Sequence, residues 1–130
     1  MDRKKLGKIL IYLILVIFAA NFVANELYWY YTIWYFDMIM HFIGGFWIGL
    51  LFFYIFPEKY SSKNVVALVA LFVFMIGVGW EVFEVLVSNT FAKNPFNILD
   101  TSSDLVFDLT GGLSATFYFF KKLCLREKIG

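Results

Sequence analysis

Two carboxylates lie inside a segment of the chain that otherwise has the composition of a membrane-spanning helix. The apolar run extends from Val65 to about Phe91, and it contains Glu81 and Glu84. Because they are three residues apart, the two side chains share one face of a helix. A charge deep in hydrocarbon costs at least ~2.5–3.5 kcal/mol on insertion scales. Both carboxylates therefore need protons, partner cations or a bound metal ion.

The composition is that of an integral membrane protein. Of the 130 residues, 62% are hydrophobic and 22% are aromatic, and the mean hydropathy is +0.76. Such usage is far from that of soluble domains. The length allows a single domain, residues 1–130. One cysteine, Cys124, excludes an intrachain disulfide and a cysteine-based metal site. The lysines flank apolar runs, so no nucleic-acid partner is expected.

Four apolar stretches predict an all-α fold, an integral membrane four-helix bundle. The predicted spans cover residues 6–25, 37–56, 65–91 and 104–121. Residues 92–103 are predicted to be a loop, and Ser103 or Asp104 has the residue type of an N-cap for the last span. A basic start before an apolar run also fits a signal peptide; we expect an uncleaved first span.

The distribution of charge predicts the orientation of the bundle. Ten of the eleven basic residues lie at or before the start of the first span, between the second and third spans, or at and beyond the end of the fourth, and only Lys93 lies on the other side. Lysine and arginine are enriched at the cytoplasmic ends of spans. Both termini are therefore predicted to be cytoplasmic in a multi-pass protein of the cytoplasmic (inner) membrane.

The connector between the first two spans, residues 26–36, is rich in tyrosine and tryptophan. Such rings gather at the membrane–water boundary, where one edge is apolar and the other is hydrated. This composition favours an interfacial belt on the outer side of the membrane. The alternative is an aromatic wall or lid over a site, because functional residues are often found on connecting segments.

Three of the predicted helices bring acidic and imidazole side chains to the same outer layer. With a rise of 1.5 Å per residue, Glu81 lies roughly 24 Å along a ~30 Å core that the third span crosses from inside. His41 and Asp108 each lie roughly 6 Å below the outer ends of their spans. The converging residues are Asp37, His41, Glu81, Glu84, Asp104 and Asp108.

On each of these three helices, small residues lie deeper in the membrane than the polar ones. They are Gly44 and Gly45 on the second span, Gly77 on the third, and Gly111 and Gly112 on the fourth. Small residues let membrane helices approach closely. We therefore predict helices that are tightly joined near the inner side and that open outward into an acidic cup.

Three interpretations of the cup compete. The first is a bound divalent cation of unknown identity, because carboxylates suit Mg and Mn, and imidazole admits Zn or Fe. The second is a set of protons and hydrogen bonds shared between helices without an ion. The third is a proton or cation pathway, which the apolar inner half disfavours. We assign the metal ligands as Asp37, His41, Glu81 and Asp108, and the candidate catalytic residues as Glu84 and Asp104.

The order of these residues resembles that of a known group of proteins. The motifs are Asp37-x-x-x-His41-Phe42-x-Gly44-Gly45, Gly79-Trp80-Glu81-x-x-Glu84, and Asp100-x-x-x-Asp104-x-x-x-Asp108-x-x-Gly111-Gly112. Together they resemble small bacterial VanZ-like membrane proteins and, more closely, the related YjdF-like inner-membrane family. VanZ-like proteins are linked to the cell envelope, so the resemblance implies an envelope location.

The favoured function is that of a membrane enzyme, a metal-dependent hydrolase or transferase of a membrane lipid. Its metal ion would polarise a phosphoryl or carbonyl oxygen, or activate water. The substrate would be a lipid head group or a lipid-linked envelope precursor, and the expected partner is the lipid bilayer. One alternative is a non-catalytic binding or scaffold protein whose polar cluster is structural. A second alternative is a cation or proton carrier.

Overall fold

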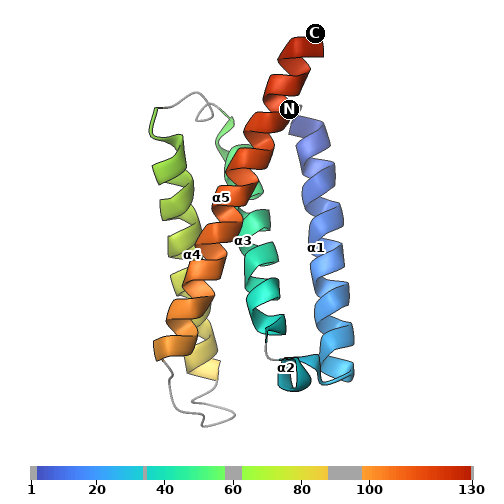
Figure 1. Ribbon diagram of the computed structural model, residues 1–130, viewed down its shortest axis with the longest axis vertical. Helices are drawn as coiled ribbons and strands as arrows, with labels where there is room; N and C mark the ends of the chain where they lie inside the picture. The colour runs from blue at the N-terminus through green and yellow to red at the C-terminus, as the bar shows by residue number, and fades with distance from the viewer. Residues whose placement is uncertain (1–2, 34, 58–62, 88–97, 130) are drawn as a thin grey trace.

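Four long helices and one short helix make up the part of the chain that the structure describes (Figure 1). This computed structural model describes residues 3–33, 35–57, 63–87 and 98–129, and the side chains of all these except 30, 31, 87, 100 and 125–129. The helices are α1 (Arg3–Glu26), α2 (Trp29–Thr32), α3 (Phe36–Ile55), α4 (Val65–Val87) and α5 (Ile98–Ile129). The predicted all-α class is confirmed.

Three of the long helices have the length and composition needed to cross a membrane. They are Arg3–Glu26, Phe36–Ile55 and Val65–Leu86. Their outward surfaces carry large apolar side chains, such as Phe18, Leu71 and Met75, which are exposed. Exposed apolar area of this extent is unfavourable in water and suits hydrocarbon. The protein is therefore a helical membrane bundle.

Helix α5 combines apolar and polar residues, and the polar ones face inward. Asp104, Asp108 and Thr116 are buried within the bundle, whereas Val106, Leu113 and Phe117 are exposed. The inward polar residues lower the hydropathy of α5 without placing a carboxylate against lipid. In Figure 1, α5 runs alongside α3 over most of its length, and these two helices form the most extensive contact in the bundle.

The first turn of α5 begins earlier than the sequence predicts. Residues 98–103 were expected in a loop with Ser103 or Asp104 as the N-cap, but α5 begins at Ile98. That assignment is wrong, because short polar residues are common both in turns and in the first turn of helices. Asp104 consequently lies inside α5, where its side chain projects from the flank of the helix. The predicted end of the third span, Phe91, and Lys93 lie outside the described residues.

The aromatic connector folds back at the end of the bundle opposite the two termini (Figure 1). Tyr28 adopts a left-handed backbone conformation with a φ of 58°, which reverses the chain between α1 and α2. The ring of Trp29 then meets that of Phe36 edge to face, with 5.6 Å between their centroids. This contact attaches the connector to the first residue of α3.

The closest packing in the molecule joins α3 to α5 through glycine. A Cβ atom added at Gly45 would collide with the backbone carbonyl of Asp108, and one added at Gly111 would collide with the carbonyl of Phe42. The two contacts are reciprocal, since each helix contributes one glycine and one carbonyl. Such backbone-to-backbone approach is what small residues permit between membrane helices.

A hydrophobic core fills the half of the bundle nearer the termini. The rings of Phe53 and Phe119 stack in parallel with 4.2 Å between their centroids. Val69 of α4 is fully buried beside them in the same core. The indole Nε1 of Trp47 donates a hydrogen bond of 2.8 Å to the carbonyl of Leu10, which fastens α1 to α3. Buried side chains from all four long helices therefore fill this half of the bundle.

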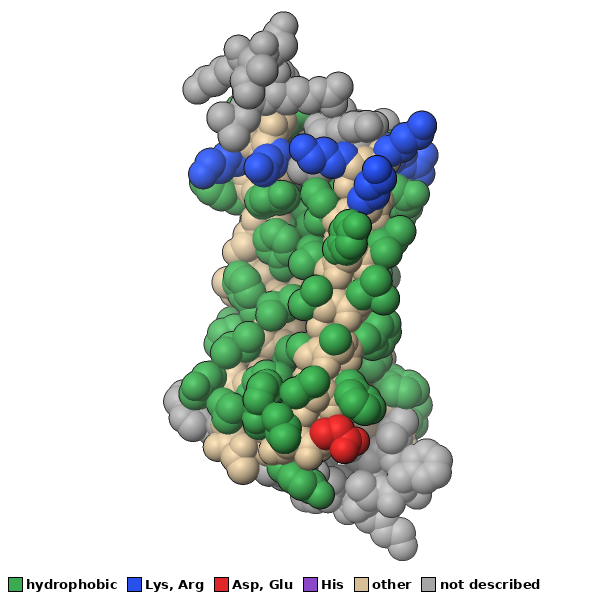
Figure 2. All heavy atoms as spheres, turned by 90° about the vertical axis from the view of Figure 1, so that its right-hand side faces the viewer, with side chains coloured by type: hydrophobic (Ala, Val, Ile, Leu, Met, Phe, Trp, Pro, Cys, Tyr) green, Lys and Arg blue, Asp and Glu red, His purple; other side chains and the backbone are tan. Residues whose placement is uncertain are grey.

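Charged side chains separate toward the two ends of the molecule. Figure 2 shows lysine and arginine in a band at one end, acidic side chains near the other, and hydrophobic side chains between them. The N- and C-termini both lie at the basic end (Figure 1). The exposed basic residues of the described chain are Arg3, Lys4, Lys5, Lys8, Lys63, Lys121 and Lys122.

We expect adjacent glycines of α3 to respond differently to substitution by alanine. Gly45→Ala forces a methyl group into the backbone of α5 and should destabilise the protein by about 1–3 kcal/mol or more. Gly44→Ala meets no atom within 4 Å and should change stability by less than about 0.5 kcal/mol. Unfolding in mixed micelles, followed by far-UV circular dichroism, measures both. Equal stability of the two variants would contradict the glycine contact.

Candidate functional site

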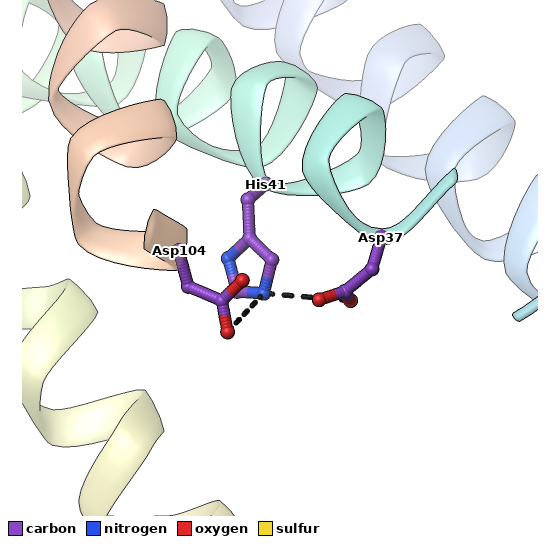
Figure 3. Close-up of side chains that lie close together, drawn as sticks. All are labelled: Asp37, His41 and Asp104. Carbon is purple, nitrogen blue, oxygen red and sulfur yellow. Dashed lines mark ion pairs between the residues drawn. The ribbon is translucent and has the colours of Figure 1, made fainter. Parts of the chain in front are cut away.

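The imidazole of His41 lies at the centre of a group of carboxylates contributed by α3 and α5. Its Nδ1 is 3.0 Å from Oδ1 of Asp108. Its Nε2 is 3.4 Å from Oδ2 of Asp104 and 3.6 Å from Oδ1 of Asp37. Figure 3 shows Asp37 and Asp104 on either side of this nitrogen. Because Asp108 occupies Nδ1, Nε2 is the nitrogen that faces the other two carboxylates.

The glycine contacts explain how these side chains come together. Gly45 packs on the backbone of Asp108, and Gly111 packs on the backbone of Phe42, the residue after His41. On α4, a Cβ atom at Gly77 would lie 2.8 Å from Oδ2 of Asp108, so glycine leaves room for that carboxylate. The small residues that tighten the bundle therefore also position its acids.

A second group of carboxylates lies between α4 and α5. One oxygen from each of Glu81, Glu84 and Asp104 lies within 4.8 Å of the others. Glu81 is buried, with 6% of its surface exposed, and its Oε1 has no hydrogen-bond partner among the described residues. Glu84 accepts a hydrogen bond of 2.8 Å from Nε1 of Trp80. Asp104 also belongs to the first group, with Asp37 and His41.

A cleft of about 540 Å³ joins the His41 group to the apolar interior between α1, α3 and α4. Its polar lining residues are Asn21, Asn25, Asp37, His41, Glu84 and Asp108. Its apolar lining includes Ile17, Ile48 and Ile76, each further along its helix toward the basic end. The cleft is therefore polar at its outer end and apolar toward the middle of the bundle. None of the described residues of the aromatic connector lines it.

A smaller cavity of about 340 Å³ lies between α4 and α5 on another side of Glu81. Apart from Glu81 and Thr101, its lining is aliphatic, and it includes Val78, Val82 and Leu105. The carboxylate of Glu81 thus lies between this apolar cavity and the acidic group. On the side of this cavity the carboxylate meets aliphatic side chains and the hydroxyl of Thr101.

The structure brings all six predicted site residues to one end of the bundle. It divides them into two adjacent groups and makes Asp104, predicted as a catalytic residue, the member common to both. Asp108 lies behind His41 as its hydrogen-bond partner. The side chain of Asp100 lies outside the described residues. Whether these residues bind metal or act in catalysis stays a prediction.

Two site residues were missed from the sequence. Asn21 and Asn25 of α1 line the cleft opposite His41. They are four residues apart, so they lie on one face of an otherwise apolar helix. Polar residues within a span tend to face the bundle interior or a water-filled cavity. The spacing of the two asparagines therefore indicates, from the sequence alone, that the first span contributes to the site.

The comparison with known protein families gives a match over almost the whole chain. A family model described as "Predicted membrane protein (DUF2238)" matches residues 2–123. The chain belongs to this family. The match includes the acidic groups, the cleft and all the glycine contacts between α3 and α5. Searches of curated proteins and of solved structures found no match.

We expect the His41–Asp108 pair to be energetically coupled. His41→Phe leaves the carboxylate of Asp108 without its partner, which should cost roughly 1–3 kcal/mol of stability. Asp108→Asn should cost less in the His41→Phe background than in the wild type, giving a coupling energy of about 0.5–3 kcal/mol. A double-mutant cycle of unfolding in mixed micelles measures this. Additive effects of the two substitutions would refute the pairing.

Proposed function

We propose that this protein binds a lipid head group, or the head group of a lipid-linked envelope precursor, at a divalent-metal site and acts on it as a hydrolase or transferase. The observation that carries the proposal is the cleft of about 540 Å³, which connects the His41 group to aliphatic side chains. A lipid has the same arrangement, with a polar group at the membrane surface and apolar chains below it.

The position of the cleft suits a ligand that arrives within the bilayer. Both α1 and α4 pack against α3, and the cleft lies between them over that helix. An acyl chain would lie along Ile17, Ile48 and Ile76, while the head group reaches His41. Asn21 and Asn25 would offer the head group amide donors and acceptors. A soluble substrate would have no use for the apolar part of this cleft.

The first carboxylate group has the donors that a divalent cation needs. Nε2 of His41 and one oxygen from each of Asp37 and Asp104 lie within 4.8 Å of one another. Such a mixture of imidazole and carboxylate suits Zn, Fe or Mn. Metal-bound histidines nearly always donate their other ring N–H to a carboxylate or carbonyl. In this proposal Asp108 orients His41, in place of the direct ligand role predicted from the sequence.

The bound metal would supply Lewis-acid chemistry by polarising a phosphoryl or carbonyl oxygen, or by activating water. Glu84 lines the cleft and is the candidate general base. Asp104, the other residue predicted as catalytic, serves here as a ligand. No lysine or arginine lines the cleft among the described residues, so the cation would hold the negative charge of a head group.

The orientation predicted from the sequence places this site at the outer leaflet of the cytoplasmic membrane. The band of basic residues and both termini lie at the end opposite the acidic groups, which supports cytoplasmic termini (Figures 1 and 2). The resemblance to VanZ-like and YjdF-like proteins supports an envelope location. An outward cleft in the inner membrane would meet lipids and lipid-linked precursors of the envelope.

A non-catalytic scaffold is the second candidate function, and one observation favours it. The imidazole of His41 on α3 contacts Asp104 and Asp108 on α5, so the polar cluster links two helices. In that case the cluster would stabilise the bundle without acting on a lipid. The third alternative, a carrier, is disfavoured, because Leu50, Val69 and Val73 fill the described inner core and are 0% exposed.

The orientation can be tested with the single cysteine of the chain. Cys124 is exposed near the C-terminal end of α5. With cytoplasmic termini, a membrane-impermeant maleimide should label Cys124 only after cells are permeabilised. A matched variant, Cys124→Ser with Glu26→Cys, should be labelled in intact cells, because Glu26 lies at the other end of α1. The reverse pattern of labelling would place the acidic groups in the cytoplasm and end the envelope proposal.

Lipid binding can be tested with two glycines that have equal space around them. A side chain at Gly44 projects without clash into the cleft, whereas Gly79, also free of clash, does not line it. Excluding two methylenes of an acyl chain costs about 1.6 kcal/mol, or more than tenfold in affinity. Gly44→Leu should therefore lose phosphatidylglycerol binding by about tenfold in the presence of Mn²⁺, and Gly79→Leu should retain it. Native mass spectrometry measures the bound lipid.

Equal lipid occupancy in the two leucine variants would refute the cleft as the binding site. Removal of divalent cations with a chelator gives a second control on the wild type. If the head group is held by the metal, lipid occupancy should fall on chelation and return with Mn²⁺. Occupancy that is insensitive to the chelator would leave the cleft as a lipid site without the proposed metal.

A further inference from the structure

We infer that Glu81, Glu84 and Asp104 hold a second divalent cation, and that Asp104 bridges it to the cation at His41. This inference rests on the proposed function, because the first cation belongs to that proposal. It adds a two-metal centre, in which Glu84 binds the second cation in place of acting as the general base, and it narrows the ligand to a phosphate-bearing head group. Two observations carry it, the convergence of the three carboxylates and the unpartnered buried oxygen of Glu81.

The first observation is the geometry of the acidic group. One oxygen from each of Glu81, Glu84 and Asp104 lies within 4.8 Å of the others, close enough for a single ion to contact all three. Glu81 and Glu84 are one turn apart on α4, and Asp104 faces them from α5. No lysine or arginine lines either adjoining cavity among the described residues, so a cation from solution would neutralise the carboxylates.

The second observation is that Glu81 is buried and that one of its carboxylate oxygens has no hydrogen-bond partner among the described residues. With 6% of its surface exposed, it is more than nine-tenths buried, and its Oε1 has no hydrogen-bond partner among the described residues. A buried carboxylate oxygen without a partner is unfavourable in a native structure. The smaller cavity beside it is lined by aliphatic groups such as Val78 and Val82 and by Thr101, which hydrogen-bonds to the Glu81 carboxyl without satisfying Oε1. A cation among the three carboxylates would satisfy this oxygen.

Asp104 gives the two sites a common ligand. Its Oδ2 is 3.4 Å from Nε2 of His41, and a carboxylate oxygen of the same residue belongs to the group with Glu81 and Glu84. A carboxylate has two oxygens and about four lone-pair directions, so it can bind two ions at once. Paired metal ions about 3.5–4 Å apart are common in enzymes that act on phosphates.

The chemistry of a two-metal centre indicates the class of ligand. Two cations clamp the oxygens of a phosphoryl group, a task that lysine and arginine perform in many other phosphate sites. The described lining of the cleft offers asparagine, histidine and carboxylates, and no fixed positive side chain apart from a protonated His41. A phosphate-bearing head group would therefore depend on the pair of ions, whereas a neutral head group would not need the second.

Counting bound Mn²⁺ on the full-length protein in detergent tests the inference. Electron paramagnetic resonance of free Mn²⁺ during a titration should give two ions per wild-type chain and an exchange-coupled signal at saturation. Glu81→Gln and His41→Gln should each retain one ion and lose the coupled signal, and Asp104→Asn should lose at least one. The matched control Glu26→Gln, at an exposed acid that ends α1, should retain two ions.

Other counts would overturn the inference and would show which part fails. One ion in both the wild type and Glu81→Gln, lost in His41→Gln, refutes the second site and leaves the proposed function intact. No ion in the wild type refutes both. One ion that is lost in Glu81→Gln and kept in His41→Gln refutes the bridged pair. Glu84→Gln, at a half-buried residue, provides a second variant if Glu81→Gln does not fold.

Discussion

The direct contact between the backbones of α3 and α5 is the constraint on which the rest of the structure depends. Gly45 and Gly111 bring each helix onto a carbonyl of the other, at the residues Asp108 and Phe42. At this separation Asp108 reaches Nδ1 of His41 across the helix interface. A larger residue at either glycine would move the two helices apart, and the hydrogen bond is lost once its two atoms separate by roughly 0.6 Å more. The same glycine contacts therefore determine both the packing of the two helices and the hydrogen bond between their polar side chains.

The site has an excess of negative charge that the described protein does not neutralise. One imidazole faces three aspartates, and two glutamates lie beyond them. Electrostatic interactions are strong in a low-dielectric interior, and like charges at close range cannot all remain ionised there. Protons or metal cations must restore the balance. The Glu81 carboxyl hydrogen-bonds to that of Asp104, and its buried Oε1, which has no hydrogen-bond partner among the described residues, is the atom that a cation would satisfy.

Much of this arrangement could be predicted from the sequence, because membrane helices obey simple rules. Apolar length identifies spans, and a fixed rise per residue places Glu81, His41 and Asp108 at one depth. Depth and helix face do not give the rotation and crossing of neighbouring helices, which decide contacts of 3–4 Å. The sharing of Asp104 between the two groups and the pairing of Asp108 with His41 therefore could not be predicted from the sequence. The start of α5 was missed because short polar residues fit both a loop and a first helical turn.

The division of the bundle into a closed half and an open half bears on the choice between function classes. In the closed half, the stacked rings of Phe53 and Phe119 and the buried Val69 leave no polar route among the described residues. In the open half, the cleft leads sideways between α1 and α4 and ends at His41. A carrier needs access from both sides of the membrane in turn, whereas a lipid-binding site needs access from one leaflet. A cleft that is polar at the end of the bundle and apolar toward its middle suits the second form of access, and this supports the proposal of a lipid head group as the ligand.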